Sequence, residues 1–153
     1  MTVTVQETDF DVGAEIAALS DGDGGAGAVA SFVGLVRGGD DGIRAMTLEH
    51  YPGMTEKALA EIVAKASGRW GLRRVRVIHR IGRLLPGDRI VFVGVSASHR
   101  GDAFAACEFM MDYLKTQAPF WKKEETSRGS RWVDAREADD VAAGRWDSTE
   151  SCD

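Results

Sequence analysis

The stretch RIVFVGVSASHRGDAFAACEFMMDYLKTQAPFWKKEET, residues 89–126, decides the fold class. Its first ten residues, 89–98, are mostly apolar and β-branched, which predicts a buried strand. Asp102 can cap a helix over residues 103–117, and Pro119 helps to end that helix. The segment PFWKKE that follows is expected to be extended. A strand, a long helix and another extended segment in succession predict a fold that mixes helices with a sheet.

The rest of the sequence adds a second long helix and further strands. Strands are expected at residues 2–6, 28–36, 43–51, 74–81 and 131–134, and helices at 11–18 and 52–70. The strand at 43–51 is expected to be the hairpin partner of the strand at 28–36, because a short glycine-rich loop joins them. The class is therefore α+β, with a mainly antiparallel or mixed sheet and two long helices.

Length and composition predict a single globular domain. The chain has 153 residues, of which 44% are hydrophobic and 28% charged. We expect residues 1–146 to form the domain and residues 147–153 to be a flexible tail. The N-terminal residues lack the basic and apolar pattern of a signal peptide, and no apolar run approaches the length of a membrane span. We therefore expect a soluble protein of the cytoplasm.

Charge argues against nucleic-acid binding but allows a local anion site. Lys and Arg number 19 against 24 Asp and Glu, a net charge of -5, whereas nucleic-acid binding depends on neutralising phosphates. The basic residues nevertheless gather between residues 100 and 136. The cysteines, Cys107 and Cys152, have no metal-ligand spacing, and we expect no disulfide between them, which fits a reducing compartment.

Three familiar catalytic or cofactor motifs fail. Glycines at 22, 24 and 27 match GxGxxG, but they precede a predicted strand, whereas a dinucleotide site has them after one. GVSAS at 94–98 lacks the final glycine and the sharp turn of a hydrolase nucleophile. The histidines are scattered without zinc-ligand spacing.

A cationic site at the ends of strands is the remaining candidate. His99 and Arg100 fall between a strand and the N-terminus of a helix, where backbone N–H groups and a guanidinium favour an anion. Arg37 also follows a strand, beside a glycine-rich turn. For Arg100 a solvated helix cap, and for Arg37 a surface hairpin charge, are equally open interpretations.

Lysines in and after the last long helix are the candidates for chemistry. An apolar stripe at helical spacing is formed by Phe104, Cys107, Met111 and Leu114. Lys115 lies on the border of this stripe, where an apolar wall and other cations would lower its pKa; a side chain that merely reaches out to solvent is the alternative. Of Lys122 and Lys123, strand alternation should turn one towards Lys115 and the other away.

Several segments resemble one enzyme family, in the same order and at similar spacing over residues 28–146. They are FVGLVR (32–37), LEHYPGMTEKAL (48–59), HRIGRLLPGD (79–88), SHR (98–100), CEFMMDYLKTQAPFWKKE (107–124) and RWVDAR (131–136). Together they resemble the large, catalytic subunit of molybdopterin synthase. The run YLKTQAPFWKKE is the most specific of them.

The resemblance implies a sulfurtransferase with an α/β hammerhead fold. In this family a small ubiquitin-like sulfur carrier inserts a C-terminal Gly-Gly thiocarboxylate into the large subunit. Two sulfurs are added to cyclic pyranopterin monophosphate, which creates the dithiolene of molybdopterin for the molybdenum cofactor. The large subunits form a homodimer with one small subunit at each outer end, a 2+2 heterotetramer. The step needs no metal or other cofactor.

The family pattern also implies roles for residues of this chain. Lys115 and Lys122 match the catalytic lysines. The residues expected to bind substrate are Leu35, Val36, Arg37, His99, Arg100, Lys123, Glu124 and Arg136. Leu35 departs from the pattern, because some relatives carry a lysine there, although its backbone contacts could remain. The family site lies near the dimer interface, so the second copy is expected to contribute part of each pocket.

Two further functions stay open on the residues alone. In a non-catalytic module for anions or nucleotides, the lysines would serve only as charges, and arginine at position 115 would be partly tolerated. In a purely structural partner subunit, the lysines could be lost without a biochemical effect.

Overall fold

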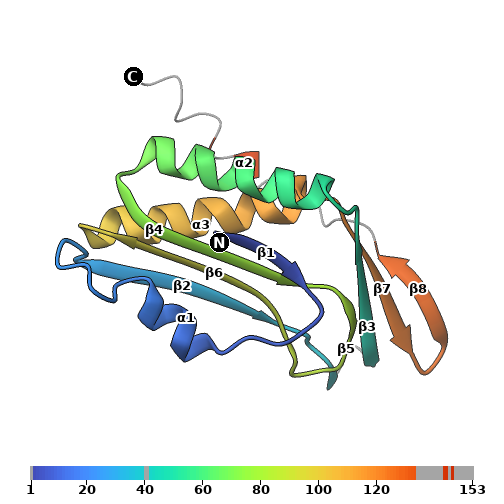
Figure 1. Ribbon diagram of the computed structural model, residues 1–153. Coiled ribbons are helices and arrows are strands. Elements are labelled where there is room, and N and C mark those ends of the chain that lie inside the picture. The colour runs from blue at the N-terminus through green and yellow to red at the C-terminus, as the bar shows by residue number, and fades with distance from the viewer. Residues whose placement is uncertain (1, 40–41, 134–142, 145, 147–153) are drawn as a thin grey trace.

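Two four-stranded sheets form the framework of the protein (Figure 1). The computed structural model describes residues 2–39, 42–133, 143–144 and 146. Sheet A has the order β1-β4-β6-β2 and sheet B the order β5-β3-β7-β8. Within this described part, no helix is long and apolar enough to cross a lipid bilayer. The α+β class expected from the sequence is confirmed.

Sheet A forms the centre of the core. Its strands are β1 (Val3–Gln6), β4 (Leu72–Arg80), β6 (Arg89–Ala97) and β2 (Ala28–Leu35). β6 pairs with β4 and β2 in antiparallel fashion, whereas β1 joins β4 in parallel. Because β6 is paired on both edges and covered on both faces, residues 91–97 are all buried.

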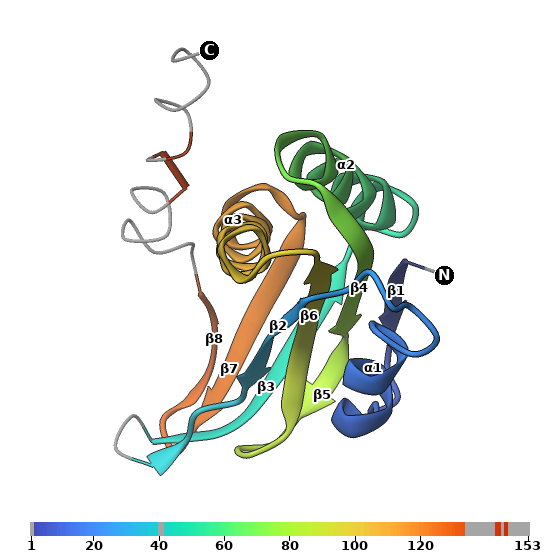
Figure 2. The same cartoon turned by 90° about the vertical axis from the view of Figure 1, so that its left-hand side faces the viewer.

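Helices cover the two faces of sheet A unequally. The long helices α2 (Met54–Arg69) and α3 (Arg100–Gln117) pack on one face and the short α1 (Val12–Ala18) on the other (Figure 2). Strand alternation explains the division: Val77 and Val93 face the long helices, whereas Ile78 and Phe92 face α1.

Sheet B meets sheet A at one end of the molecule. It contains β5 (Gly82–Leu84), β3 (Ile43–His50), β7 (Phe120–Thr126) and β8 (Gly129–Val133). Val36, just beyond the end of β2, packs with Met46, Leu48 and Leu84 of sheet B in a small apolar cluster. This cluster, against which Ile90 of β6 also packs, joins the two sheets.

The expected hairpin between residues 28–36 and 43–51 is wrong. β2 pairs with β6, and β3 lies in the other sheet between β5 and β7. Glycines fit β2 to β6: a Cβ on Gly27 would lie 2.0 Å from the carbonyl oxygen of Ser98, and one on Gly34 would lie 2.7 Å from Val91 Cγ1. The glycines allow β2 to lie close to β6, and this explains the pairing. The alternation of apolar residues in the sequence does not show which strands approach each other so closely.

The helix boundaries also differ from the expectation. α2 begins at Met54 rather than Pro52, after Gly53 at φ 81, whose N–H donates to Glu56. α3 begins at Arg100, with His99 as the residue before its first turn, rather than at a cap on Asp102. A helix can start without a side-chain cap where packing fixes it, so the capping rule gave a start a few residues late.

Candidate functional site

Lys115 lies at the end of α3 where the two sheets meet. α3 follows β6 directly and runs back along sheet A, so its last turn lies over the beginning of β6 (Figure 1). Lys115 is in that last turn and its side chain is exposed. The expected apolar stripe beside it is only partly correct, because Phe104 is 68% exposed while Cys107, Met111 and Leu114 are buried.

The chain turns from α3 into β7 at residues 118–120, here called the α3–β7 corner. Ala118 leaves the helix with extended backbone angles, φ -78 and ψ 128. The carbonyl of Pro119 accepts a hydrogen bond of 3.1 Å from the hydroxyl of Thr55. Phe120 begins β7 and stacks on His79 of β4, with ring centroids 3.7 Å apart. The corner is thus held from two sides, and Lys122 follows it by two residues.

Strand β7 directs its two adjacent lysines to opposite faces. Lys122 lies opposite Leu48 of β3 and Val133 of β8, on the face that Phe120 also occupies. Lys123 belongs to the other face, where its Nζ lies 5.8 Å from the ring centroid of Trp132. Strand β7 thus places Lys123 on the face opposite to that of Lys122.

Glu124 returns to the face of Lys122. Its side chain is buried, opposite Met46, and its Oε2 lies 3.4 Å from Arg131 Nη2. A buried carboxylate needs such a partner, because an unpaired charge is costly away from water. Glu124 therefore adds a fixed negative charge beside Lys122.

Residues 35–37 lie at the same end of the molecule. Leu35, the last residue of β2, is opposite Arg89, the first residue of β6, and is 56% exposed. Val36 is buried in the cluster that includes Leu48, the cross-strand neighbour of Lys122. Arg37 is exposed. The structure therefore places this segment, Lys115 and Lys122 around the junction of the two sheets.

His99 and Arg100 lie at the opposite end of the molecule. They are at the N-terminus of α3 and both are exposed. Lys115 is fifteen positions after Arg100 in the helix, a distance of about 22 Å along the axis. Within one chain, these residues cannot act on the same small molecule as Lys115. Arg136, the remaining expected contact, lies outside the described residues.

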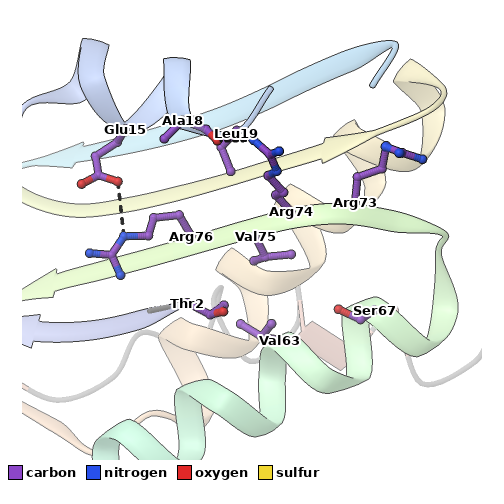
Figure 3. A pocket seen from close by; sticks show the side chains of 10 residues that line it. All are labelled: Thr2, Glu15, Ala18, Leu19, Val63, Ser67, Arg73, Arg74, Val75 and Arg76. Atoms are coloured by element: carbon purple, nitrogen blue, oxygen red, sulfur yellow. Dashed lines mark hydrogen bonds and ion pairs between the residues drawn. The ribbon is translucent and has the colours of Figure 1, made fainter. Parts of the chain in front are cut away.

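A separate cavity of about 520 Å³ lies beside β4, between α1 and α2 (Figure 3). Its cations, here called the arginine cluster, are Arg73, Arg74 and Arg76. Acidic side chains and carbonyl groups already engage all three. The hydrogen bonds, from 2.6 to 3.2 Å, join Arg73 to Asp23, Arg74 to the carbonyls of Ala18 and Asp21, and Arg76 to Glu15 and Thr4.

Because all three arginines already have partners within the protein, the arginine cluster is a structural feature rather than an anion site. Its partners all come from residues 4–23, so the guanidinium groups fasten α1 and the following loop to β4. The Arg73 guanidinium lowers the pKa of the Asp23 carboxyl to about 2. A ligand phosphate would have to displace carboxylates that are already in place.

Sequence reasoning missed His79. Its side chain is only 5% exposed, its Nδ1–H donates to the carbonyl of Arg80 at 2.8 Å, and it stacks on Phe120. Burial, and then the nearby charges of Lys115 and His50, lower the pKa of His79 to about 4. The sequence did contain a signal for the burial of His79: it follows Val75 and Val77 at two-residue spacing, on the same inward face of the strand.

Known proteins are similar to this chain over nearly its whole length. The family model described as MoaE protein matches residues 5–117. A molybdopterin synthase catalytic subunit from Ralstonia nicotianae is 63% identical over 147 residues, 95% of this chain and 84% of that protein. Another such subunit, from Escherichia coli, is 59% identical over 94% of this chain and 97% of that protein.

Solved structures share the fold. A molybdopterin biosynthesis MoaE protein from Burkholderia ambifaria superposes with a TM-score of 0.82 at 60% identity, covering 95% of this chain and 97% of that one. A complex of subunits 1 and 2 of molybdopterin-converting factor from Helicobacter pylori gives a TM-score of 0.74. At 20% identity, over 88% and 91% of the two chains, this second likeness shows the fold alone.

Proposed function

The chain belongs to the MoaE family, together with catalytic subunits of molybdopterin synthase, and on this premise we propose a reaction for it. Two molecules of a small carrier protein each give the one sulfur of their C-terminal thiocarboxylate to cyclic pyranopterin monophosphate. The product is the dithiolene of molybdopterin. The observation that carries the proposal is the α3–β7 corner, which brings Lys115 and Lys122 to one junction beside residues 35–37.

The two lysines supply the chemistry. Lys115, exposed at the end of α3, reaches the carbonyl of the carrier tail and the pterin, and Lys122 assists from the neighbouring strand. The thiocarboxylate sulfur bonds to the pterin, and water then adds to the acyl carbon, so that the C–S bond breaks and the carrier tail is left as a carboxylate. An ammonium group next to this carbon stabilises the oxyanion that forms when water adds. The same groups move protons while the cyclic phosphate opens.

Substrate contacts surround these lysines. Arg37 offers positive charge to anionic groups beside Leu35 and Val36. The Val36 N–H itself donates to the carbonyl of Asp88, so Val36 contributes its position rather than a free donor. Glu124 lies on the face of Lys122. Lys123 faces the other side of β7 and is left out of this site. Arg136 remains a proposed anion contact.

A second copy of the chain completes the pocket. His99 and Arg100 belong to an anion site for the pterin phosphate, yet they are about 22 Å from the lysine of their own chain. We assign them to the site whose Lys115 comes from the other protomer. This arrangement agrees with a homodimer that carries a small subunit at each end, a 2+2 heterotetramer working in the cytoplasm. The Helicobacter pylori protein of the same fold forms a complex of two subunits, in line with a partner subunit for this chain.

The test is dithiolene formation from cyclic pyranopterin monophosphate and thiocarboxylated small subunit. The wild type is expected to form product, and Lys115→Ala and Arg100→Ala are each expected to be inactive although folded. Mixing the two inactive variants in equal amounts and letting subunits exchange should restore about a quarter of wild-type activity. Half of the dimers are then mixed, and each mixed dimer has one intact site of two.

The outcomes separate the parts of the proposal. No recovery on mixing, with exchange verified by mass spectrometry, would refute the shared site. An inactive wild type with a competent carrier would instead favour a module that only binds anions.

A further inference from the structure

The α3–β7 corner is the only covalent link between the helix that carries Lys115 and the strand that carries Lys122. Two buried polar residues hold it. Thr55 is 0% exposed; its hydroxyl donates to Pro119 and accepts from the N–H of Tyr51. His79 supports the next residue, since its ring lies nearly parallel to Phe120, at 19° and 3.7 Å.

We propose that His79 is a positioning residue for sulfur transfer: its imidazole holds Phe120, and through Phe120 it fixes the spacing of Lys115 and Lys122. The inference rests on the proposed roles of those lysines. His79 comes from β4 of sheet A and Phe120 from β7 of sheet B, so the stack joins the two sheets at the site. A reaction that needs two groups at once is sensitive to small errors in their separation.

The local geometry explains why an imidazole can serve here. The hydrogen bond from Nδ1–H to the Arg80 carbonyl fixes the orientation of the ring, so its face stays against Phe120. The ring is also neutral, because burial lowers the pKa of His79 to about 4. The charged or titratable groups facing it are Lys115 from α3 and His50 from β3, and His50 Nε2 lies 3.4 Å from Glu56 of α2. A neutral flat ring packs beside the ammonium group of Lys115 without repelling it.

Two substitutions of His79 distinguish the effect of its aromatic ring from the effect of its volume. His79→Leu keeps the apolar volume and removes the stack, whereas His79→Phe keeps a ring. Val77→Ala is the matched control, because Val77 is buried on the same face of β4 two residues away. Each variant is assayed for dithiolene formation with the thiocarboxylated carrier, for KM, for carrier affinity and for thermal unfolding.

We expect His79→Leu to lower kcat about tenfold with KM and carrier affinity unchanged. His79→Phe should retain most of the wild-type kcat, and Val77→Ala should lose stability but not kcat. Wild-type kcat in His79→Leu would overturn the proposal, as would a His79→Phe variant as slow as His79→Leu. An equal loss of kcat in Val77→Ala would also overturn it, because general loosening of the core would then explain the effect.

Lys115→Ala in the same assay keeps the two proposals apart. If it is inactive while His79→Leu is fully active, only the positioning role falls. If it is active, the proposed lysine site falls, and the positioning role falls with it.

Discussion

The arginine cluster of β4 and the cations at the two ends of α3 are both rich in positive charge, but only one of them has its charge satisfied. Arg73, Arg74 and Arg76 are bound to carboxylates and carbonyls of the N-terminal segment. In the described part of the chain, no ion pair within 4.0 Å engages Lys115 or Arg100. The arginines of the cavity that looks like an anion site are thus already paired by the protein itself, whereas the exposed cations at the ends of α3 remain available to a substrate.

Removing one cation from each set gives the largest expected difference between the two regions. Lys115→Ala should lower the rate of dithiolene formation about a hundredfold or more and leave the melting temperature unchanged, because Lys115 is exposed. Arg73→Ala should do the reverse, with a normal rate and a melting temperature lower by about 2–4 °C. Kinetics and thermal unfolding of both variants check this. A rate defect in Arg73→Ala would show that the cavity takes part in the reaction.

A smaller effect distinguishes the neighbouring lysines of β7. Lys122→Ala should lower kcat about tenfold, because Lys122 shares a face with the corner. Lys123→Ala should keep the wild-type kcat, since it loses only its contact with Trp132. Steady-state kinetics with saturating carrier measure both. Equal losses of kcat in the two variants would mean that lysines on both faces of β7 take part in the reaction.

The smallest effect concerns the ion pair of Asp23. Because Arg73 lowers the pKa of Asp23 to about 2 from its usual 3.8, the carboxylate contributes stability above about pH 4 and loses it as the pH falls through about 2. Asp23→Asn should lower the melting temperature by roughly 2 °C at neutral pH, and the difference should shrink on acidification. Asp21→Asn in the same loop is the control and should have no such effect. A difference that is constant with pH would contradict the assignment.

Local patterns predicted most of the elements but not their neighbours. The strongly apolar run of β6 and the Asp11 cap of α1 are local signals, and both are confirmed. The predicted partner of β2 was wrong, because strand alternation indicates which face of a strand is buried and not which strand pairs with it. The three-residue β5 was missed because three residues are too few for any periodicity.

The site was predictable in the same uneven way. The lysine pair followed from the family pattern, and strand alternation correctly separated Lys122 from Lys123. His79 was overlooked because its importance comes from Phe120, which is 41 positions away in sequence and belongs to the other sheet. The distance between Lys115 and Arg100 follows from the length of the predicted helix. How a second copy of the chain would bring the two residues together cannot be derived from one sequence.

The His79–Phe120 stack also offers a spectroscopic reporter. Imidazole protons held over a phenyl ring experience its ring current, so their NMR signals should move upfield, away from those of exposed histidines. Because the pKa of His79 is about 4, these signals should stay constant through neutral pH. Any event that shifts Phe120, such as entry of a carrier tail beside Lys122, would then register at an atom that the tail never touches and without an added label.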